Sequence, residues 1–152
     1  MQPNVVRKAV ACVVRDVAGA SELLVFDHPT AGTQIPKGTM EPGEDVAAAA
    51  LRELAEESGV RDAVVHGLLG VWTRTAGAGP REHGAPERHD WHVVLVRPRI
   101  ALGDRWDHIA TGSPEEEGLV FRFRWVRVDD ALPARLHPLF GAVAEILRRA
   151  VR

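Results

Sequence analysis

The chain has 152 residues, of which 45% are hydrophobic and 26% are charged, and its formal net charge is −2. This length fits one domain, and the composition is ordinary for a globular protein. The slight acidity gives no overall reason to expect nucleic-acid binding, and no apolar run approaches the roughly 18 residues that a membrane span needs.

The first ten residues, MQPNVVRKAV, lack the long apolar region of a secretory signal. Cys12 is the only cysteine, so no intrachain disulfide can form. Because it lies in an apolar run, we expect a buried small hydrophobe rather than a nucleophile. These features together favour a cytoplasmic protein.

The first third of the chain predicts two strands, a long loop and a helix. The run from Lys8 to Arg15 is rich in Val and Ala, as in a buried strand, and a turn around Gly19 leads to a second strand over Glu22 to Asp27. Loops are expected over residues 28–35 and 36–43, where Pro and Gly recur. A helix follows from about Glu44 to Ser58, with Gly59 as its stop.

The remaining two thirds predict more strands and a closing helix. Extended structure is expected over 61–75, 90–97 and 119–128, a surface loop over 76–88, an irregular stretch over 98–114, a short helical turn over 129–135 and an amphipathic helix from Pro138. Strands mixed with two helices suggest a sheet covered on both faces, an α/β fold.

The predicted helix carries an unusual cluster of carboxylates. Glu53, Glu56 and Glu57 fall within an arc of about 100°, at spacings of i, i+3 and i+4. Like charges at this spacing repel by roughly 0.2–0.5 kcal/mol per pair, and Arg52 can pair with only some of them. A divalent cation would replace that repulsion with coordination, since magnesium favours carboxylate oxygens.

The segment from Gly38 to Val60 resembles the Nudix box. It reads Gly38, five residues, Glu44, seven residues, then Arg52-Glu53-Leu54-x-Glu56-Glu57-x-Gly59-Val60.

The resemblance implies an α/β/α sandwich with a mixed central sheet, and a single Nudix hydrolase domain over residues 1–152. It also implies hydrolysis of a pyrophosphate bond with one to three Mg²⁺ or Mn²⁺ ions. Glu53, Glu56 and Glu57 would bind metal with the backbone carbonyl of Gly38, and Arg52 and Glu44 would support them. The resemblance also makes a homodimer an expectation.

The general base in this family often comes from outside the box. Glu115, Glu116 and Glu117 form an acidic run before a strand, and we favour Glu116 and Glu117 as an extra base or metal ligand. Weaker alternatives lie in the expected surface loop or just beyond it: Glu82, His83, Glu87 and His89. Glu53 itself is either a third ligand or the acceptor of the water's proton.

Two residues are candidates for contact with a small-molecule nucleotide or diphosphate substrate. Lys37 precedes Gly38 directly and could neutralise phosphate charge, and Trp106, flanked by charged residues, could stack on a nucleobase. Nucleoside diphosphate sugars and related conjugates rank first as substrates together with dinucleotides, nucleoside triphosphates second, and capped or triphosphorylated RNA third. The competing hypotheses are a non-catalytic nucleotide-binding regulatory module with the same fold, and a helix surface with coincidental acids.

Overall fold

The structure is a computed structural model, and it describes residues 4–76 and 86–151. Eight strands form one sheet: β1 (Asn4–Val17), β2 (Ala20–His28), β3 (Gly32–Gln34), β4 (Lys37–Thr39), β5 (Ala63–Ala76), β6 (Glu87–Pro98), β7 (Arg105–Ile109) and β8 (Val120–Arg127). The helices are α1 (Val46–Ser58) and α2 (Gly141–Ala150), and two 3₁₀ turns, Leu132–Arg135 and Pro138–Phe140, precede α2.

The sheet is mixed and is organised around β1. Its strand order is β5-β6-β1-β2-β8-β7, with β3 added to β2 and β4 added to β1. β1 pairs in parallel with β6 over its first ten residues and antiparallel with β4 and β2. Because β1 alternates between two apolar faces, its odd-numbered residues from Ala9 pack towards α1, and its even-numbered residues from Val10 pack towards α2.

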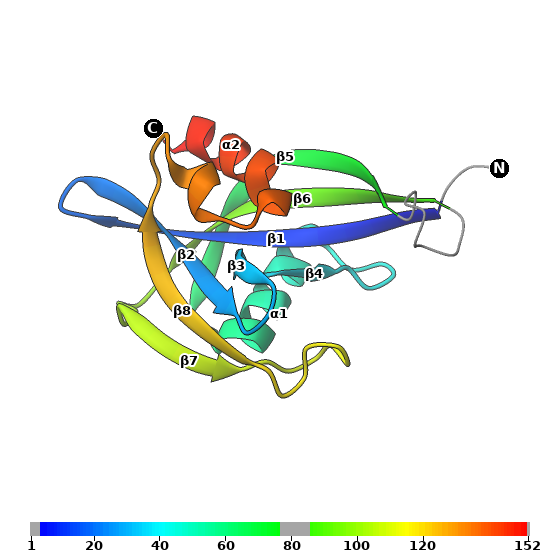
Figure 1. Cartoon of the computed structure of the whole chain (residues 1–152), viewed down its shortest axis with the longest axis horizontal. Helices are drawn as coiled ribbons and strands as arrows, with labels where there is room; N and C mark the ends of the chain where they lie inside the picture. The colour runs from blue at the N-terminus through cyan, green and yellow to red at the C-terminus, as the bar shows by residue number, and fades with distance from the viewer. Residues whose placement is uncertain (1–3, 77–85, 152) are drawn as a thin grey trace.

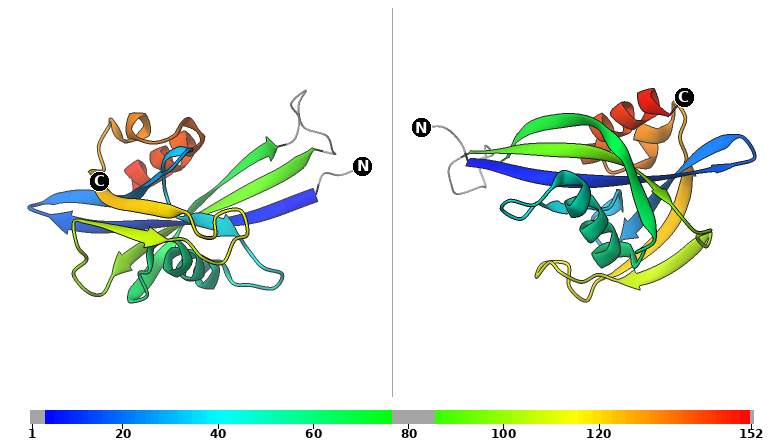
Figure 2. Two further views of the ribbon diagram at one scale, coloured as in Figure 1. Left: turned by 60° about the horizontal axis from the view of Figure 1, so that its bottom comes forward. Right: turned by 180° about the vertical axis from the view of Figure 1, so that it is seen from behind.

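Figures 1 and 2 show the two helices on opposite sides of the sheet, so the fold is the expected α/β/α sandwich. One core lies between the sheet and α1 and includes Phe26, Leu54 and Phe121, all essentially inaccessible to solvent. The other lies between the sheet and α2 and includes Trp91, Phe140 and Leu147. Neither helix in the described ranges is long and apolar enough to cross a membrane.

Three short strands were missed by the sequence analysis. β3 and β4 lie in the two segments expected to be loops, and β7 lies in the stretch expected to be irregular. Strands of three to five residues show too few alternations to stand out locally, and they form here because β1, β2 and β8 offer them backbone partners.

The expected loop over 76–88 is also partly wrong. Ala76 pairs with Glu87 and Thr75 with Arg88, so both ends of that segment continue the β5–β6 ladder. Glu82 and His83 lie outside the described residues, whereas Glu87 and His89 stand on β6.

The expected burial of Cys12 is confirmed. Cys12 is fully buried, and burial raises the pKa of its thiol to about 12, which leaves it an inert hydrophobe. His92 is also buried, on β6, with Nδ1 3.2 Å from the backbone carbonyl oxygen of Lys8.

Candidate active site

Helix α1 begins and ends at sharply defined residues. It starts two residues later than expected, because Asp45 is extended and its side chain accepts a hydrogen bond from the Ala48 N–H at 3.4 Å. It ends at Gly59, whose φ of 79° suits glycine. Between these caps, Glu53 and Glu57 lie one turn apart on the buried side of the helix, while Glu56 is half-exposed.

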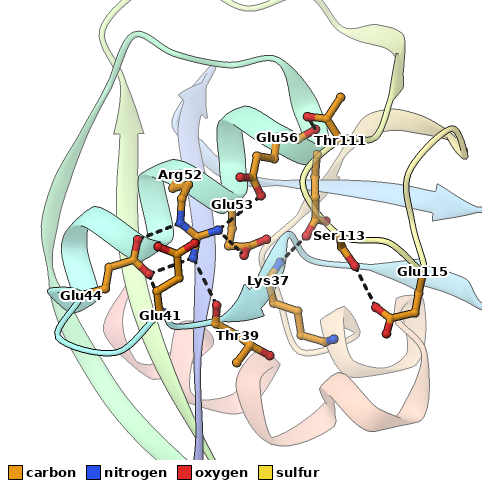
Figure 3. Close-up of polar contacts among 11 residues, drawn as sticks. Lys37, Thr39, Glu41, Glu44, Arg52, Glu53, Glu56, Thr111, Ser113 and Glu115 are labelled. Atoms are coloured by element: carbon orange, nitrogen blue, oxygen red, sulfur yellow. Dashed lines mark hydrogen bonds and ion pairs between the residues drawn. The ribbon is translucent and has the colours of Figure 1, made fainter.

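Arg52 links the carboxylates around it, as Figure 3 shows. Its guanidinium donates two hydrogen bonds to Glu44, from Nε at 2.7 Å and from Nη2 at 2.8 Å. Nη1 donates to Glu53 at 2.9 Å and to Glu56 at 3.4 Å, and Nη2 reaches the Thr39 carbonyl at 3.2 Å. This two-pronged, or bidentate, contact is the strongest arrangement of an arginine with a carboxylate. It lowers the pKa of Glu44 to about 2.

Gly38 lies directly against the carboxylate of Glu53. A Cβ atom at position 38 would stand 2.0 Å from Glu53 Cδ, far inside any real contact. β1 holds Gly38 opposite Ala9, so the backbone of β4 cannot retreat easily. The missing side chain is therefore what allows the helix to bring Glu53 up to the strand.

Glu57 is the most buried acid of the site. Its exposed fraction is 3%, and its Oε1 accepts a hydrogen bond from the Lys37 backbone N–H at 3.3 Å. Burial raises the pKa of Glu57 well above its usual range, and the charges of Glu116 and Glu53 raise it further. Burial likewise raises the pKa of Glu53, against the opposing effect of Arg52.

A second chain segment completes the site. The Thr111 N–H and hydroxyl both donate to the carbonyl of Glu56, at 3.1 and 3.3 Å, which joins the loop after β7 to the helix. Gly112 follows with a φ of 89°, and a Cβ there would stand 2.3 Å from Glu56 Cδ. This loop then carries Ser113, Glu115 and Glu116 to the carboxylate cluster.

These elements enclose a cleft of about 310 Å³. Its wall includes Lys8, Lys37, Gly38, Arg52, Glu53, Glu115 and Glu116. Of the acidic run, Glu116 is the half-buried member whose charge acts on both Glu53 and Glu57. Glu115 accepts a hydrogen bond from the Ser113 hydroxyl at 2.9 Å. Glu117 is exposed and is not part of this wall.

Trp106 does not lie in the cleft. It stands on β7 beside the far end of α1, where its Nε1–H donates to the Ser58 carbonyl at 2.9 Å and its ring stacks on Phe123 at 5.3 Å between centroids. It lines a separate hollow with Gly59 and His108. The structure thus gives this indole a packing role and a satisfied N–H, away from the carboxylates.

The donors of the site fit a divalent ion in kind, because they are carboxylate oxygens on the wall of an open cleft. As the side chains stand, no three acidic, histidine or cysteine side chains within residues 4–76 and 86–151 are gathered closely enough to hold one ion. The guanidinium of Arg52 lies between two of these carboxylates, since its Nη1 contacts both Glu53 and Glu56. An ion would therefore compete with its guanidinium for these two carboxylates.

Sequence reasoning missed Lys8 and Gly112. Lys8 lies at the start of a buried strand, and only its pairing with β4 shows that it reaches the cleft. Gly112 is one glycine among several in a stretch without periodicity. One local signal existed for Lys8: it is one of only two lysines in the chain, and Lys37 is the other.

Comparison with known proteins gives one consistent result. Residues 5–148 match the NUDIX domain family. The human diphosphoinositol polyphosphate phosphohydrolase 3-beta is 27% identical over 132 residues, which are 86% of this chain and 70% of that protein.

Solved structures share the fold at low identity. An Ap4A hydrolase from C. elegans is 22% identical with a TM-score of 0.58, and the match covers 96% of both chains. The NUDIX domain of Shewanella oneidensis NrtR, complexed with ADP ribose, is 15% identical with a TM-score of 0.68, and the match covers 100% of this chain and 91% of that one.

Proposed function

Because the chain belongs to the NUDIX family of hydrolases, we propose that it is a metal-dependent pyrophosphohydrolase acting on a nucleoside diphosphate linked to another moiety. Water would attack phosphorus and release the two phosphorylated halves. The observation that carries this proposal is the position of Glu53 and Glu57: both are buried, yet Glu53 lies on the wall of an open cleft and Glu57 lies one helical turn from it. Buried acids with raised pKa values at a cleft are typical of functional sites.

The metal would be held by Glu53, Glu56 and Glu57, together with the carbonyl of Gly38. Bound Mg²⁺ or Mn²⁺ supplies charge neutralisation of the phosphates and a more acidic water. Burial and mutual repulsion raise the pKa values of Glu53 and Glu57, so these acids gain most from a cation nearby.

The other side chains of the cleft would position a metal ligand, accept a proton or contact the substrate. Arg52, itself held by the two-pronged contact with Glu44, fixes one oxygen of Glu53. Glu116 lies on the same cleft wall, and its carboxylate is our candidate for accepting the proton of the attacking water. Glu53 remains the alternative acceptor. Lys37, the first residue of β4 and part of the cleft wall, would contact a substrate phosphate.

The relatives support hydrolysis over a binding module, since they are named as hydrolases of compounds rich in phosphate: diphosphoinositol polyphosphate and Ap4A. A Streptococcus suis ADP-ribose pyrophosphatase shares the fold at 15% identity and a TM-score of 0.60.

The test is phosphate release from a panel of nucleotide conjugates with Mg²⁺ or Mn²⁺. Glu57→Gln should lower turnover at least about 100-fold while the fold is retained, because it removes one buried ligand without changing volume. Glu145→Gln, which removes a carboxylate from α2 on the opposite side of the sheet, is the matched control and should keep full activity. Equal turnover by wild type and Glu57→Gln would contradict the proposed site.

A further inference from the structure

The two lysines of the chain are brought together by neighbouring strands. In the β1–β4 ladder Lys8 faces Thr39 and Val10 faces Lys37, so Lys8 and Lys37 are diagonal neighbours on one face of the sheet. Diagonal neighbours across an antiparallel pair are roughly 7–8 Å apart at Cα. Both residues are half-buried and both line the cleft.

Neither ammonium has an anionic partner in the described part of the chain. The ion pairs among residues 4–76 and 86–151 involve arginine or histidine, and neither lysine side chain donates a hydrogen bond there. Lys37 Nζ instead lies 5.2 Å from the ring centroid of Trp91 and 5.9 Å from that of Phe140. Its side chain extends away from Arg52 in Figure 3, which leaves its N–H donors unused.

The charges around the pair are unbalanced in a way that favours an anion. Burial and the like charge of Lys37 lower the pKa of Lys8, whereas the smaller effects of Glu53, Glu116 and Glu115 oppose this shift. Two half-buried ammonium groups without a counter-ion are unfavourable. Once the carboxylates are committed to a cation, they no longer compensate the lysines, and an anion bound beside that cation would.

We propose that Lys8 and Lys37 bind a phosphate group beyond the diphosphate that is hydrolysed, so that the substrate is a polyphosphorylated compound with three or more phosphates. This inference rests on the proposed function, which places the hydrolysed diphosphate at the carboxylate cluster. The lysines lie on the α2-facing side of the sheet, while Glu53 and Glu57 come from α1 on the other side. A substrate that uses both ends of the cleft needs anionic groups beyond the two phosphates at the carboxylates.

The competing possibility is that both lysines hold the hydrolysed diphosphate itself. Non-hydrolysable methylene-bridged diphosphonate and triphosphonate compounds separate the two, measured by calorimetry with Mg²⁺ present. Wild-type protein should bind the triphosphonate roughly 10-fold or more tightly than the diphosphonate, since a charged hydrogen bond is gained.

Substitutions of Lys8 test whether this preference for the triphosphonate depends on the lysine pair. Lys8→Gln should remove it while leaving the diphosphonate affinity within about 2-fold, and Lys8→Arg should retain it because the charge remains. Arg7→Gln is the matched control: this exposed residue precedes Lys8, faces the other side of β1, and loses the same charge. It should leave both affinities unchanged, which separates local binding from a general loss of positive charge.

An equal loss of both affinities in Lys8→Gln overturns the proposal, and so does a wild-type protein that does not prefer the triphosphonate. Hydrolysis by wild type that fails only in Glu57→Gln would then leave the proposed function standing without this subsite. Absence of hydrolysis from every conjugate would overturn the function and this inference together.

Discussion

The glycine at position 112 provides a sharp test of how the site is assembled. In Gly112→Ala the new Cβ would lie 2.3 Å from Cδ and Oε2 of Glu56 and 2.7 Å from Oε1. Ordinary contacts begin near 3.4 Å, so the carboxylate must move by about 1 Å or more. Because it ends a flexible side chain, the carboxylate can swing aside while α1 stays in place.

Backbone strain has to be separated from this displacement. A side chain at the positive φ of Gly112, 89°, costs about 1–2 kcal/mol wherever the neighbours lie. Gly118 in the same loop has a φ of 87° and nothing within 4 Å of a new Cβ, so Gly118→Ala carries the same strain without the collision. Both variants should lose roughly 2–8 °C in Tm.

The two variants should differ in metal binding. We expect Gly112→Ala to bind Mn²⁺ about 10–100-fold more weakly than Gly118→Ala, because a misplaced ligand weakens a site by that order. Titration followed by electron paramagnetic resonance of free Mn²⁺ measures this without turnover. The Mg²⁺ concentration for half-maximal hydrolysis should rise in parallel. Equal Mn²⁺ affinity in the two alanine variants would refute the claim that the loop positions Glu56.

Three further predictions concern single side chains. The pKa of Glu57 is raised above its usual 4.5, so wild-type stability without metal should fall as the pH rises from 4.5 through the raised value. Glu57→Gln removes this penalty, and thermal scans in chelator should place its Tm above that of wild type at pH 8 but not at pH 4. Arg52→Lys keeps the charge but loses the two-pronged contact with Glu44, and kcat should fall at least about 10-fold; an unchanged kcat would exclude a positioning role. Trp106→Phe should cost about 1 kcal/mol in the free energy of unfolding through the lost bond to Ser58, with KM for nucleotides unchanged; a 10-fold rise in KM would restore it as a substrate contact.

The helix and its carboxylates were predictable because their determinants are local. Apolar residues recur at helical spacing, Gly59 marks the end, and Glu53, Glu56 and Glu57 follow from their spacing alone. The burial of Glu53 and Glu57 was not predictable, because it depends on where the sheet lies. Glu53 is buried since it meets the backbone at Gly38, a contact between a helix and a strand that no local pattern encodes.

The second half of the site depends on contacts between distant segments. Gly112 meets Glu56 only because β7 pairs with β8 and the intervening loop folds back onto the helix. Lys8 meets Lys37 only because β4, a strand of three residues, adds to β1. The sequence singled out the acidic run of Glu115, Glu116 and Glu117, and the structure places Glu115 and Glu116 on the cleft wall. The sequence could not show that Glu117 lies outside this wall, since the turn geometry decides which carboxylates face the cleft.

The charges of the cleft explain why the single side chain of Arg52 contacts three carboxylates. Without a cation, the carboxylates of α1 repel each other, and Arg52 is the group that relieves Glu44, Glu53 and Glu56 together. A cation bound at the site would take over that role for Glu53 and Glu56, while the two-pronged contact with Glu44 is independent of both and would keep the guanidinium beside the site. Under the proposed function, Arg52 would hold these acids together before a metal binds and would still release them to it, because the arginine has its own anchor in Glu44.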